Sequence, residues 1–364
     1  MANDVGLALS ASVLMHVAWN LIARHQPREA EPLWWVLLAH AVLLGPWGLY
    51  SLITEVAWDA RFVALLATSA TANAVYFLGL GRAYGHAPVA LVYPLVRSSP
   101  LLIGIWSWLL FAEVLGTLAW LGVALNVAGL LLMAATGRGN SEGRAMPWAM
   151  LAMLATSVYS LSDKAATGHV ASFGGLVGYI TVGYLVSWAM ISLRLRRTTG
   201  RWTPRKPIRA SAIVAGGLFI GLAYALVIHA MRFLPAAEVV AYTNAGIALA
   251  TVISMVVYRE RTHWPLRLVG TALVCAGLLS LALGRSGLEL LPDAGHERPS
   301  FPTTAPASDA RRPLPLSAIS GRTRGARPSF ASGRHAPVGK IDHGLAPAPL
   351  RDAPAAAARH RRLA

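Results

Sequence analysis

Residues 82–95 read RAYGHAPVALVYPL, and residues 229–242, which lie 147 positions further along, read HAMRFLPAAEVVAY. At this offset Pro88 matches Pro235, and beyond the quoted stretches Glu113 matches Glu260. Similarity at a fixed offset is the signature of an internal repeat. These two stretches therefore predict a chain that is built from two related halves.

The composition predicts that both halves lie in a membrane. Of the 364 residues, 55% are hydrophobic and 13% are charged, with a mean hydropathy of +0.51, whereas a soluble domain has about 25% charged residues. The net charge of +16 divides into +9 for residues 1–284 and +7 for residues 285–364. In the first stretch the charges fall in short gaps between apolar runs, so we expect no nucleic-acid partner. The single cysteine, Cys275, excludes an internal disulfide and a cysteine-cluster metal site.

Ten apolar runs are long enough for transmembrane helices, each of which needs about 20 residues to cross a bilayer. The runs are continuously apolar and do not alternate as the strands of a membrane barrel do, so we predict an all-α integral membrane protein. From Arg285 onward the sequence is rich in Pro, Ala, Ser and Arg, and we expect residues 285–364 to be a disordered basic tail. The ten runs are residues 4–24, 33–53, 62–82, 89–111, 116–135, 147–168, 174–194, 210–231, 236–258 and 265–284.

Each half contains five predicted spans, and because five is odd the second half must enter the membrane from the opposite side. We expect residues 1–137 to form one five-helix repeat and residues 138–284 to form a second, inverted one. Inverted repeats related by a pseudo-twofold axis are common in secondary transporters, whose substrate site lies near the bilayer midplane between the halves.

Glycines at helical spacing predict close packing of several spans. Gly122 and Gly129 in the fifth span match Gly270 and Gly277 in the tenth when one residue is inserted. Glycines seven apart lie on one face of a helix and allow a neighbouring backbone to approach closely. The same reasoning applies to Gly174 and Gly178 in the seventh span and to Gly217 and Gly221 in the eighth. We assign no chemistry to these residues.

Three stretches carry a family likeness. They are HVAWNLIAR at residues 16–24, AYGHAPVALVYPLVRSSPLL…FAEVLGTLAWLGVALNVAGLLL from residue 83, and AMRFLPAAEVVAYTNAG…VYRERTHWPLRLVGTALVCAGLLSL from residue 230. They resemble the EamA-domain family of the drug/metabolite transporter superfamily, and the likeness covers about residues 5–284. The resemblance implies a ten-helix fold with a central cavity lined by spans 1, 3, 4, 6, 8 and 9. It does not specify a substrate, because the family transports amino acids, drugs and other metabolites.

Arg97 is the clearest candidate for a substrate contact. It lies about 12 Å inside its predicted span at 1.5 Å per residue, and an ionisable side chain at that depth is costly unless it faces a cavity or a partner. Tyr93 lies one turn earlier on the same face. Pro94 and Pro100 flank Arg97 and loosen the helix, which gives Ser98 room to point inward. A guanidinium suits a carboxylate or a phosphonate; the alternative is that Arg97 pairs with an internal acid.

Other polar side chains in the cavity-lining spans are further candidates for substrate binding. Asn244 is the repeat equivalent of Arg97, so we expect the two to face each other, with Tyr242 close to Asn244. Tyr224 is the repeat equivalent of Phe77, which indicates an aromatic lining on both sides. Each of these polar residues has the alternative role of bonding a neighbouring helix. The remaining candidates are Trp19 and Asn20 in the first span, Asn73 and Tyr76 in the third, and Tyr159 in the sixth.

Three titratable residues are candidates for coupling transport to an ion. His16 titrates near neutral pH, although a lone histidine in a membrane also serves as a hydrogen-bond partner between helices. Glu238 lies about 3 Å inside its predicted helix, where a carboxylate in interfacial water is the alternative. Asp163 lies one turn after Tyr159, and its alternative is an interfacial pair with Lys164.

The sequence contains no nucleotide-binding GxxxxGK[ST] loop and no HExxH or GxSxG motif, so neither ATP-driven pumping nor an enzyme is expected. We expect a monomeric secondary transporter in the cell membrane, an exporter that moves a small polar or amphipathic metabolite by alternating access. Its partners are the metabolite and membrane lipid, with no cofactor and no metal. The alternative is a flippase for a lipid-linked head group. The Lys and Arg residues of the loops favour both termini outside the cell, whereas the family resemblance implies termini in the cytoplasm.

Overall fold

The computed structural model describes residues 2–24, 26, 30–137, 142–257, 259 and 263–290. This part of the chain is helical and contains no strand. The described residues all belong to one compact unit. Glu260, which the repeat matches with Glu113, lies outside the described residues. Residues 291–364, which make up most of the expected disordered tail, lie outside them as well. The elements are α1 (Ala2–Arg24), α2 (Pro32–Leu43), α3 (Gly45–Glu55), α4 (Ala60–His86), α5 (Val89–Val96), α6 (Ser99–Phe111), α7 (Thr117–Ala135), the 3₁₀ turn η2 (Glu142–Arg144), α8 (Met146–Ala166), α9 (Phe173–Thr199), α10 (Ala210–Met231), α11 (Ala236–Thr243), α12 (Ala245–Val256) and α13 (Trp264–Leu290).

Eight helical segments of the described chain are long and apolar enough to cross a membrane. A ninth is added if α2 and α3, which are bent by 56° at Leu44, count as one span. The bend precedes Pro46, which has no N–H to continue the ladder of α2. The sixth predicted span corresponds to α8, a helix of 21 residues that is not among the eight. The second half of α8 includes both Asp163 and Lys164.

One predicted boundary is wrong. The last helix, α13, does not end at Gly284 but continues to Leu290, so the first six residues of the predicted tail are helical. The sequence from Arg285 to Leu290 contains no proline, and the helical ladder can therefore continue through it.

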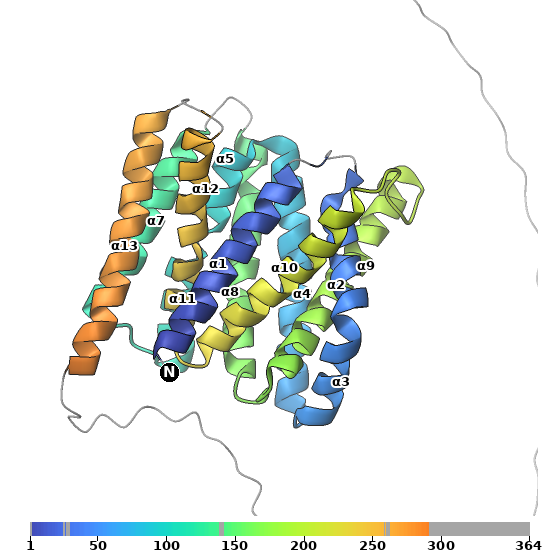
Figure 1. Ribbon diagram of the computed structural model, residues 1–364, viewed down its shortest axis with the longest axis horizontal. Helices are drawn as coiled ribbons and strands as arrows, with labels where there is room; N and C mark the ends of the chain where they lie inside the picture. Colours follow the sequence, from blue (N-terminus) through green and yellow to red (C-terminus); the bar gives the residue numbers. More distant parts are fainter. Residues whose placement is uncertain are drawn as a thin grey trace, which may run out of the picture. The chain divides into compact units, whose positions relative to one another are not determined.

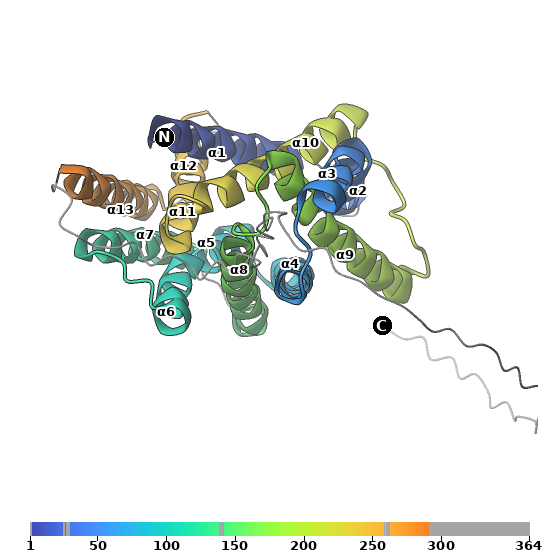
Figure 2. The ribbon, with the colours of Figure 1, turned by 90° about the horizontal axis from the view of Figure 1, so that it is seen from below.

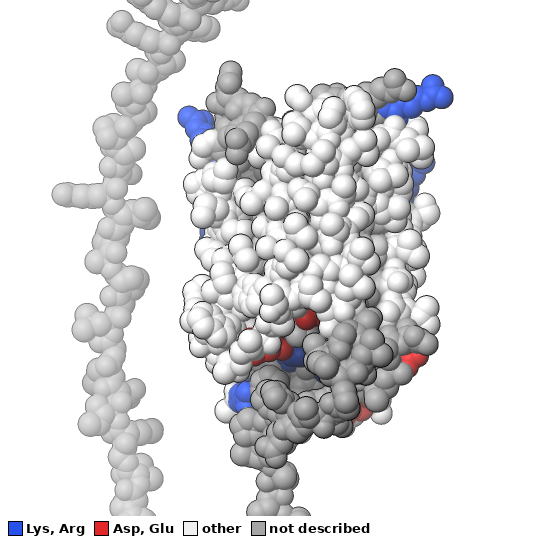
Figure 3. All heavy atoms as spheres, turned by 90° about the vertical axis from the view of Figure 1, so that its left-hand side faces the viewer, with Lys and Arg blue, Asp and Glu red and all other residues white. Residues whose placement is uncertain are grey.

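The helices lie in two layers (Figures 1 and 2). Figure 2 shows α11, α12, α1 and α10 along one side of the bundle and α6, α5, α8 and α4 along the other. Within the layers α1 packs on α10 and α4 packs on α8, and α6 joins the layers by packing on α11. The bundle is closed at its two ends by α7 with α13 and by α2 and α3 with α9. On the face formed at the α13 side, uncharged side chains cover most of the height and charged side chains gather toward the two ends (Figure 3). This distribution is that of a surface in contact with lipid.

The predicted glycine packing is confirmed. A Cβ built on Gly129 of α7 would lie 2.5 Å from the carbonyl oxygen of Gly270 in α13, and one on Gly277 would lie 2.6 Å from that of Gly122. The two backbones therefore touch along this seam, which only residues without a side chain allow. A second seam joins α3 to α9, where a Cβ on Gly48 would lie 2.7 Å from the backbone of Gly178.

Two of the spans are broken near their middle. The first break separates α5 from α6 at Arg97 and Ser98, between Pro94 inside α5 and Pro100 at the start of α6. The second break separates α11 from α12 at Asn244. The sequence predicts a loosened helix at the first break, because each proline removes a backbone donor, and it gives no such signal at the second.

Candidate functional site

The two helix breaks meet inside the bundle, where Asn244 is fully buried. The Asn244 side-chain amide donates to the backbone oxygen of Arg97 at 3.2 Å and to the side-chain oxygen of Asn126 at 2.7 Å. Asn126, on α7, in turn donates to the backbone oxygen of Ala241 at 3.4 Å. Arg97 and Asn244, which we expect from the sequence to face each other, are therefore in contact. Asn126 was missed, although a lone asparagine in the apolar run LGVALNVAGLL (residues 121–131) is the signal that identifies it.

The Arg97 guanidinium has few partners of its own. Its Nη2 donates to the Thr243 hydroxyl at 3.2 Å, and its central carbon lies 5.7 Å from the centre of the Tyr93 ring. Its Nε is buried without a hydrogen-bond partner. Among the described residues no Asp or Glu forms an ion pair with Arg97. The positive charge is therefore held by polar and aromatic groups, and a hydrogen-bond donor remains unused.

Tyrosines surround this cation. Tyr76, Tyr84, Tyr93 and Tyr159 all lie close enough to Arg97 to interact with it electrostatically. The rings of Tyr76 and Tyr159 are 5.8 Å apart and nearly perpendicular, a favourable arrangement for aromatic pairs. The structure thus brings three predicted residues from α4, α5 and α8 to Arg97. Tyr84 was not predicted.

The three predicted residues of α1, which are His16, Trp19 and Asn20, have different surroundings. His16 lies within electrostatic range of Arg97, and its Nδ1 lies 3.0 Å from the backbone oxygen of Ser12 in its own helix. Asn20 is exposed and donates to the backbone oxygen of His16 at 2.8 Å. Trp19 is buried against Gly216 of α10. Of these three residues, His16 is therefore the one that interacts electrostatically with Arg97.

Asn73 lies away from this centre. Its side-chain oxygen accepts a hydrogen bond from Ser187 of α9 at 3.0 Å, and both side chains are buried. This contact ties α4 to α9. The alternative role, a bond between helices, describes Asn73 in this structure.

Asp163 is the centre of a second polar cluster. Ser69 of α4 donates to one carboxylate oxygen at 2.5 Å, and Tyr224 of α10 donates to the other. Lys164 does not pair with Asp163 and instead donates to two backbone oxygens in the α10–α11 connection, at 2.6 and 2.9 Å. The expected interfacial pair is therefore absent. Ser69 was not identified from the sequence, since a single serine in an apolar span carries little signal.

Glu238 and Tyr242 lie on α11, outside the Arg97 centre. Glu238 is buried, not in interfacial water, and one of its carboxylate oxygens has no hydrogen-bond partner. Both side chains interact electrostatically with Arg285 of α13, and Glu238 also does so with Lys164. We had expected Tyr242 opposite Arg97, but its charged neighbours are Glu238 and Arg285.

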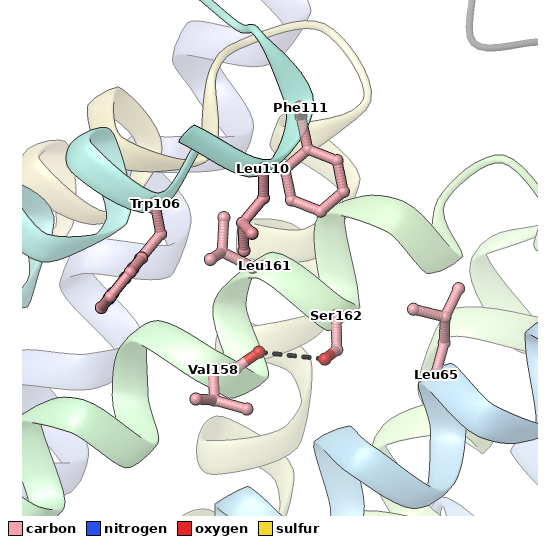
Figure 4. A pocket seen from close by; sticks show the side chains of 7 residues that line it. All are labelled: Leu65, Trp106, Leu110, Phe111, Val158, Leu161 and Ser162. Atoms are coloured by element: carbon pink, nitrogen blue, oxygen red, sulfur yellow. Dashed lines mark hydrogen bonds between the residues drawn. The ribbon is translucent and has the colours of Figure 1, made fainter. Parts of the chain in front are cut away.

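Two apolar hollows lie on the side of the bundle. One, of about 350 Å³, lies between α4, α6 and α8 (Figure 4). Trp106, Leu110 and Phe111 point into it from α6, and the hydroxyl of Ser162 is turned back to the carbonyl of Val158 at 3.0 Å. The other lies between α4 and α8. Neither is lined by a charged side chain or by any residue that we predicted for the site.

Comparison with known proteins shows the fold and nothing further. No family model and no curated protein matches this chain. Among solved structures 28 chains match. One, described only as "Crystal structure of protein", has a TM-score of 0.60 and 18% sequence identity and covers 79% of this chain and 99% of its own.

The fold and the apolar helices together define a multi-pass membrane protein. The interior of its described part contains two polar clusters, one at Arg97 and one at Asp163.

Proposed function

We propose that the protein is a secondary transporter, similar to the EamA-domain family, that moves a small polar or amphipathic metabolite across the cell membrane by alternating access. The observation that carries the proposal is the meeting of two broken spans at Arg97 and Asn244. Transporters form midplane sites from discontinuous helices, because unwound backbone is tolerated in a membrane only where protein or a cavity surrounds it.

The pattern of helix packing supports two inverted five-helix halves. Exchanging the halves exchanges α1 with α8 and α4 with α10, so the pair α1–α10 becomes the pair α8–α4, and both pairs are observed. The exchange also converts the pair α7–α13 into itself, because the two helices change places. The contact of α2 and α3 with α9 is converted into itself in the same way. The broken spans obey the same relation, because Arg97 and Asn244 are equivalent positions 147 residues apart. In this arrangement α8 and the bent pair α2–α3 complete ten crossings.

The contacts of Arg97 support a substrate with an anionic group. A guanidinium binds a carboxylate or phosphonate through two parallel hydrogen bonds, and Arg97 has a free Nε and no acidic partner among the described residues. The rings of Tyr76, Tyr93 and Tyr159 provide apolar contact area beside it. The absence of charged side chains from the linings of the two lateral hollows favours a soluble metabolite over a lipid-linked head group.

The test is transport by purified protein in lipid vesicles. Vesicles with wild type, Arg97→Ala, Arg97→Lys or Arg61→Ala are supplied with a panel of labelled amino acids, monocarboxylates and dicarboxylates. Arg61 is exposed at the start of α4 and serves as the matched control. We expect Arg97→Ala to lower the rate for the transported compound by about tenfold to a hundredfold, since a hydrogen bond to a charged group contributes about 1.5–3 kcal/mol. Arg97→Lys keeps the positive charge but cannot form two parallel hydrogen bonds, so we expect it to transport faster than Arg97→Ala and more slowly than wild type.

Unchanged transport in Arg97→Ala, at a thermal stability equal to wild type, would remove Arg97 from the substrate site. Two results together would contradict the proposed function itself. They are that wild type transports no compound of the panel and that overexpressing cells show no phenotype in a metabolite-resistance screen.

A further inference from the structure

Asp163 is the carboxylate buried in the second polar cluster. Its side chain is 0% exposed, and it lies in α8 between α4 and α10. A buried ionised carboxylate costs several kcal/mol unless hydrogen bonds or a cation compensate for the lost water. What surrounds this group therefore decides what it can do.

The compensation comes from hydroxyl groups on other helices. Ser69 donates from α4 at 2.5 Å and Tyr224 donates from α10. Two helices thus donate hydroxyl groups to a single carboxyl group on a third. Tyr179 of α9 lies beside it, and its hydroxyl donates to the backbone oxygen of Leu65 at 3.4 Å.

No cation of the described chain balances this carboxylate. Lys164, the next residue, is bonded to backbone oxygens at 2.6 and 2.9 Å. The titratable groups that face Asp163 are all phenols, and α4 contributes only the Ser69 hydroxyl. In their described parts α5, α6, α11 and η2, which also pack on α8, place no charged group against it. The phenols are those of Tyr159 on α8 itself, Tyr179 and Tyr184 on α9, and Tyr224 on α10.

Asp163 is consequently the group of this cluster that can exchange a proton at physiological pH, because phenols and serine remain protonated there. The ionised carboxylate accepts from both Ser69 and Tyr224. The protonated acid has one O–H to donate, and a hydroxyl that accepts from it must direct its own hydrogen to another acceptor. Binding of one proton therefore changes the hydrogen bonds that tie α8 to α4 and to α10.

The cluster is connected to the Arg97 centre. The ring of Tyr159 lies 5.8 Å from the ring of Tyr224, which bonds Asp163, and 5.8 Å from the ring of Tyr76, which lies beside Arg97. Tyr224 is thus in ring contact with Tyr159, one of the tyrosines that interact with the cation. The contact also crosses between chain halves, since Ser69 lies in the first and Asp163 in the second.

We propose that Asp163 is the proton site that couples substrate movement to the transmembrane proton gradient. The proposal rests on the proposed function. A proton from one aqueous side binds a carboxylate oxygen of Asp163, the ties from α8 to α4 and α10 rearrange as the halves rock, and the same proton leaves to the other side. No other reactant is consumed.

The first test needs no substrate. Infrared spectra of the protein in lipid are recorded across a pH titration for wild type, Asp163→Asn and Glu55→Gln; Glu55 is exposed at the end of α3. We expect a C=O stretching band of a protonated carboxyl that grows as the pH is lowered, is lost in Asp163→Asn and is kept in Glu55→Gln. If the band is absent at every pH, Asp163 is always ionised, and if the band is present at every pH, Asp163 is always protonated. Either result overturns the proposal.

The second test separates coupling from transport. In vesicles an imposed pH gradient should drive accumulation of the carboxylate identified in the panel. Asp163→Asn should lose this accumulation and keep exchange of labelled for unlabelled compound, whereas Glu55→Gln should keep both. If Asp163→Asn still accumulates the compound, or if wild-type transport does not respond to the pH gradient, the proposed coupling is wrong. The proposal that the protein is a transporter would be unaffected by either result. Absence of all transport overturns the proposed function and the coupling with it.

Discussion

The seam between α7 and α13 gives a prediction whose size follows from the structure. In Gly129→Ala the new Cβ would lie 2.5 Å from the Gly270 oxygen and 2.9 Å from both the backbone nitrogen and a methyl group of Val274. A carbon in contact with a carbonyl oxygen normally lies about 3.3–3.6 Å away. The helices must therefore separate by about 0.8–1.1 Å, and neither of the two backbone atoms in contact can turn aside.

Overpacking of this kind costs about 1–3 kcal/mol, while alanine in place of glycine inside a helix returns up to about 1 kcal/mol. We expect a net loss of about 1–2 kcal/mol in the free energy of unfolding. The assay is tryptophan fluorescence during thermal unfolding in lipid nanodiscs. Gly277→Ala, with a Cβ 2.6 Å from the Gly122 oxygen, should behave alike.

Gly81→Ala is the matched control, because a Cβ on Gly81 in α4 meets nothing within 4 Å. Its unfolding temperature should equal or exceed that of wild type through helix propensity alone. If Gly129→Ala were as stable as Gly81→Ala, α7 and α13 could not approach each other as closely as the structure has them.

Three further predictions concern helix ends. Ser172→Ala should cost about 1 kcal/mol of stability on denaturant titration, because the Ser172 hydroxyl accepts from the N–H of Gly175 at 2.9 Å and caps α9. Lys164→Met should cost about 1–3 kcal/mol in the same assay, because it leaves two carbonyl oxygens without their donor. The Phe62 N–H, bonded at 2.6 Å, lowers the pKa of Asp59. The stabilisation from Asp59 is therefore present above the usual carboxyl pKa and lost as pH falls through the lowered value, so wild type and Asp59→Asn should converge in unfolding temperature at acid pH.

The helix breaks show where sequence reasoning succeeds and where it stops. Pro94 and Pro100 predict a loosened helix at Arg97, since the loss of a backbone donor is a local property. The break at Asn244 has no proline beside it, and its amide is bonded to Arg97 and Asn126, each more than a hundred residues away in the chain. Such a contact follows from the packing of distant helices, which local patterns do not encode.

Asp163 and Lys164 show the same limit for charged residues. Opposite charges at adjacent positions suggest a pair in the sequence, but successive residues of a helix point in directions about 100° apart. In the structure Asp163 turns toward Ser69 and Tyr224, while Lys164 turns to the backbone after α10. The apolar runs predicted an all-helical membrane protein, and the glycine spacing predicted closely packed faces on α7 and α13. Neither pattern predicted the direction of each polar side chain.

The packing pairs have a consequence for how this chain is made. The pairs α1–α10, α4–α8, α3–α9 and α7–α13 each join a helix before residue 138 to one after it. While the ribosome is still adding the later helices, the glycine face of α7 has only lipid beside it, and Ser69 has no carboxylate to bond. The packing of the early helices is therefore completed only once α8 to α13 have been inserted, so neither half can reach its final packing without the other.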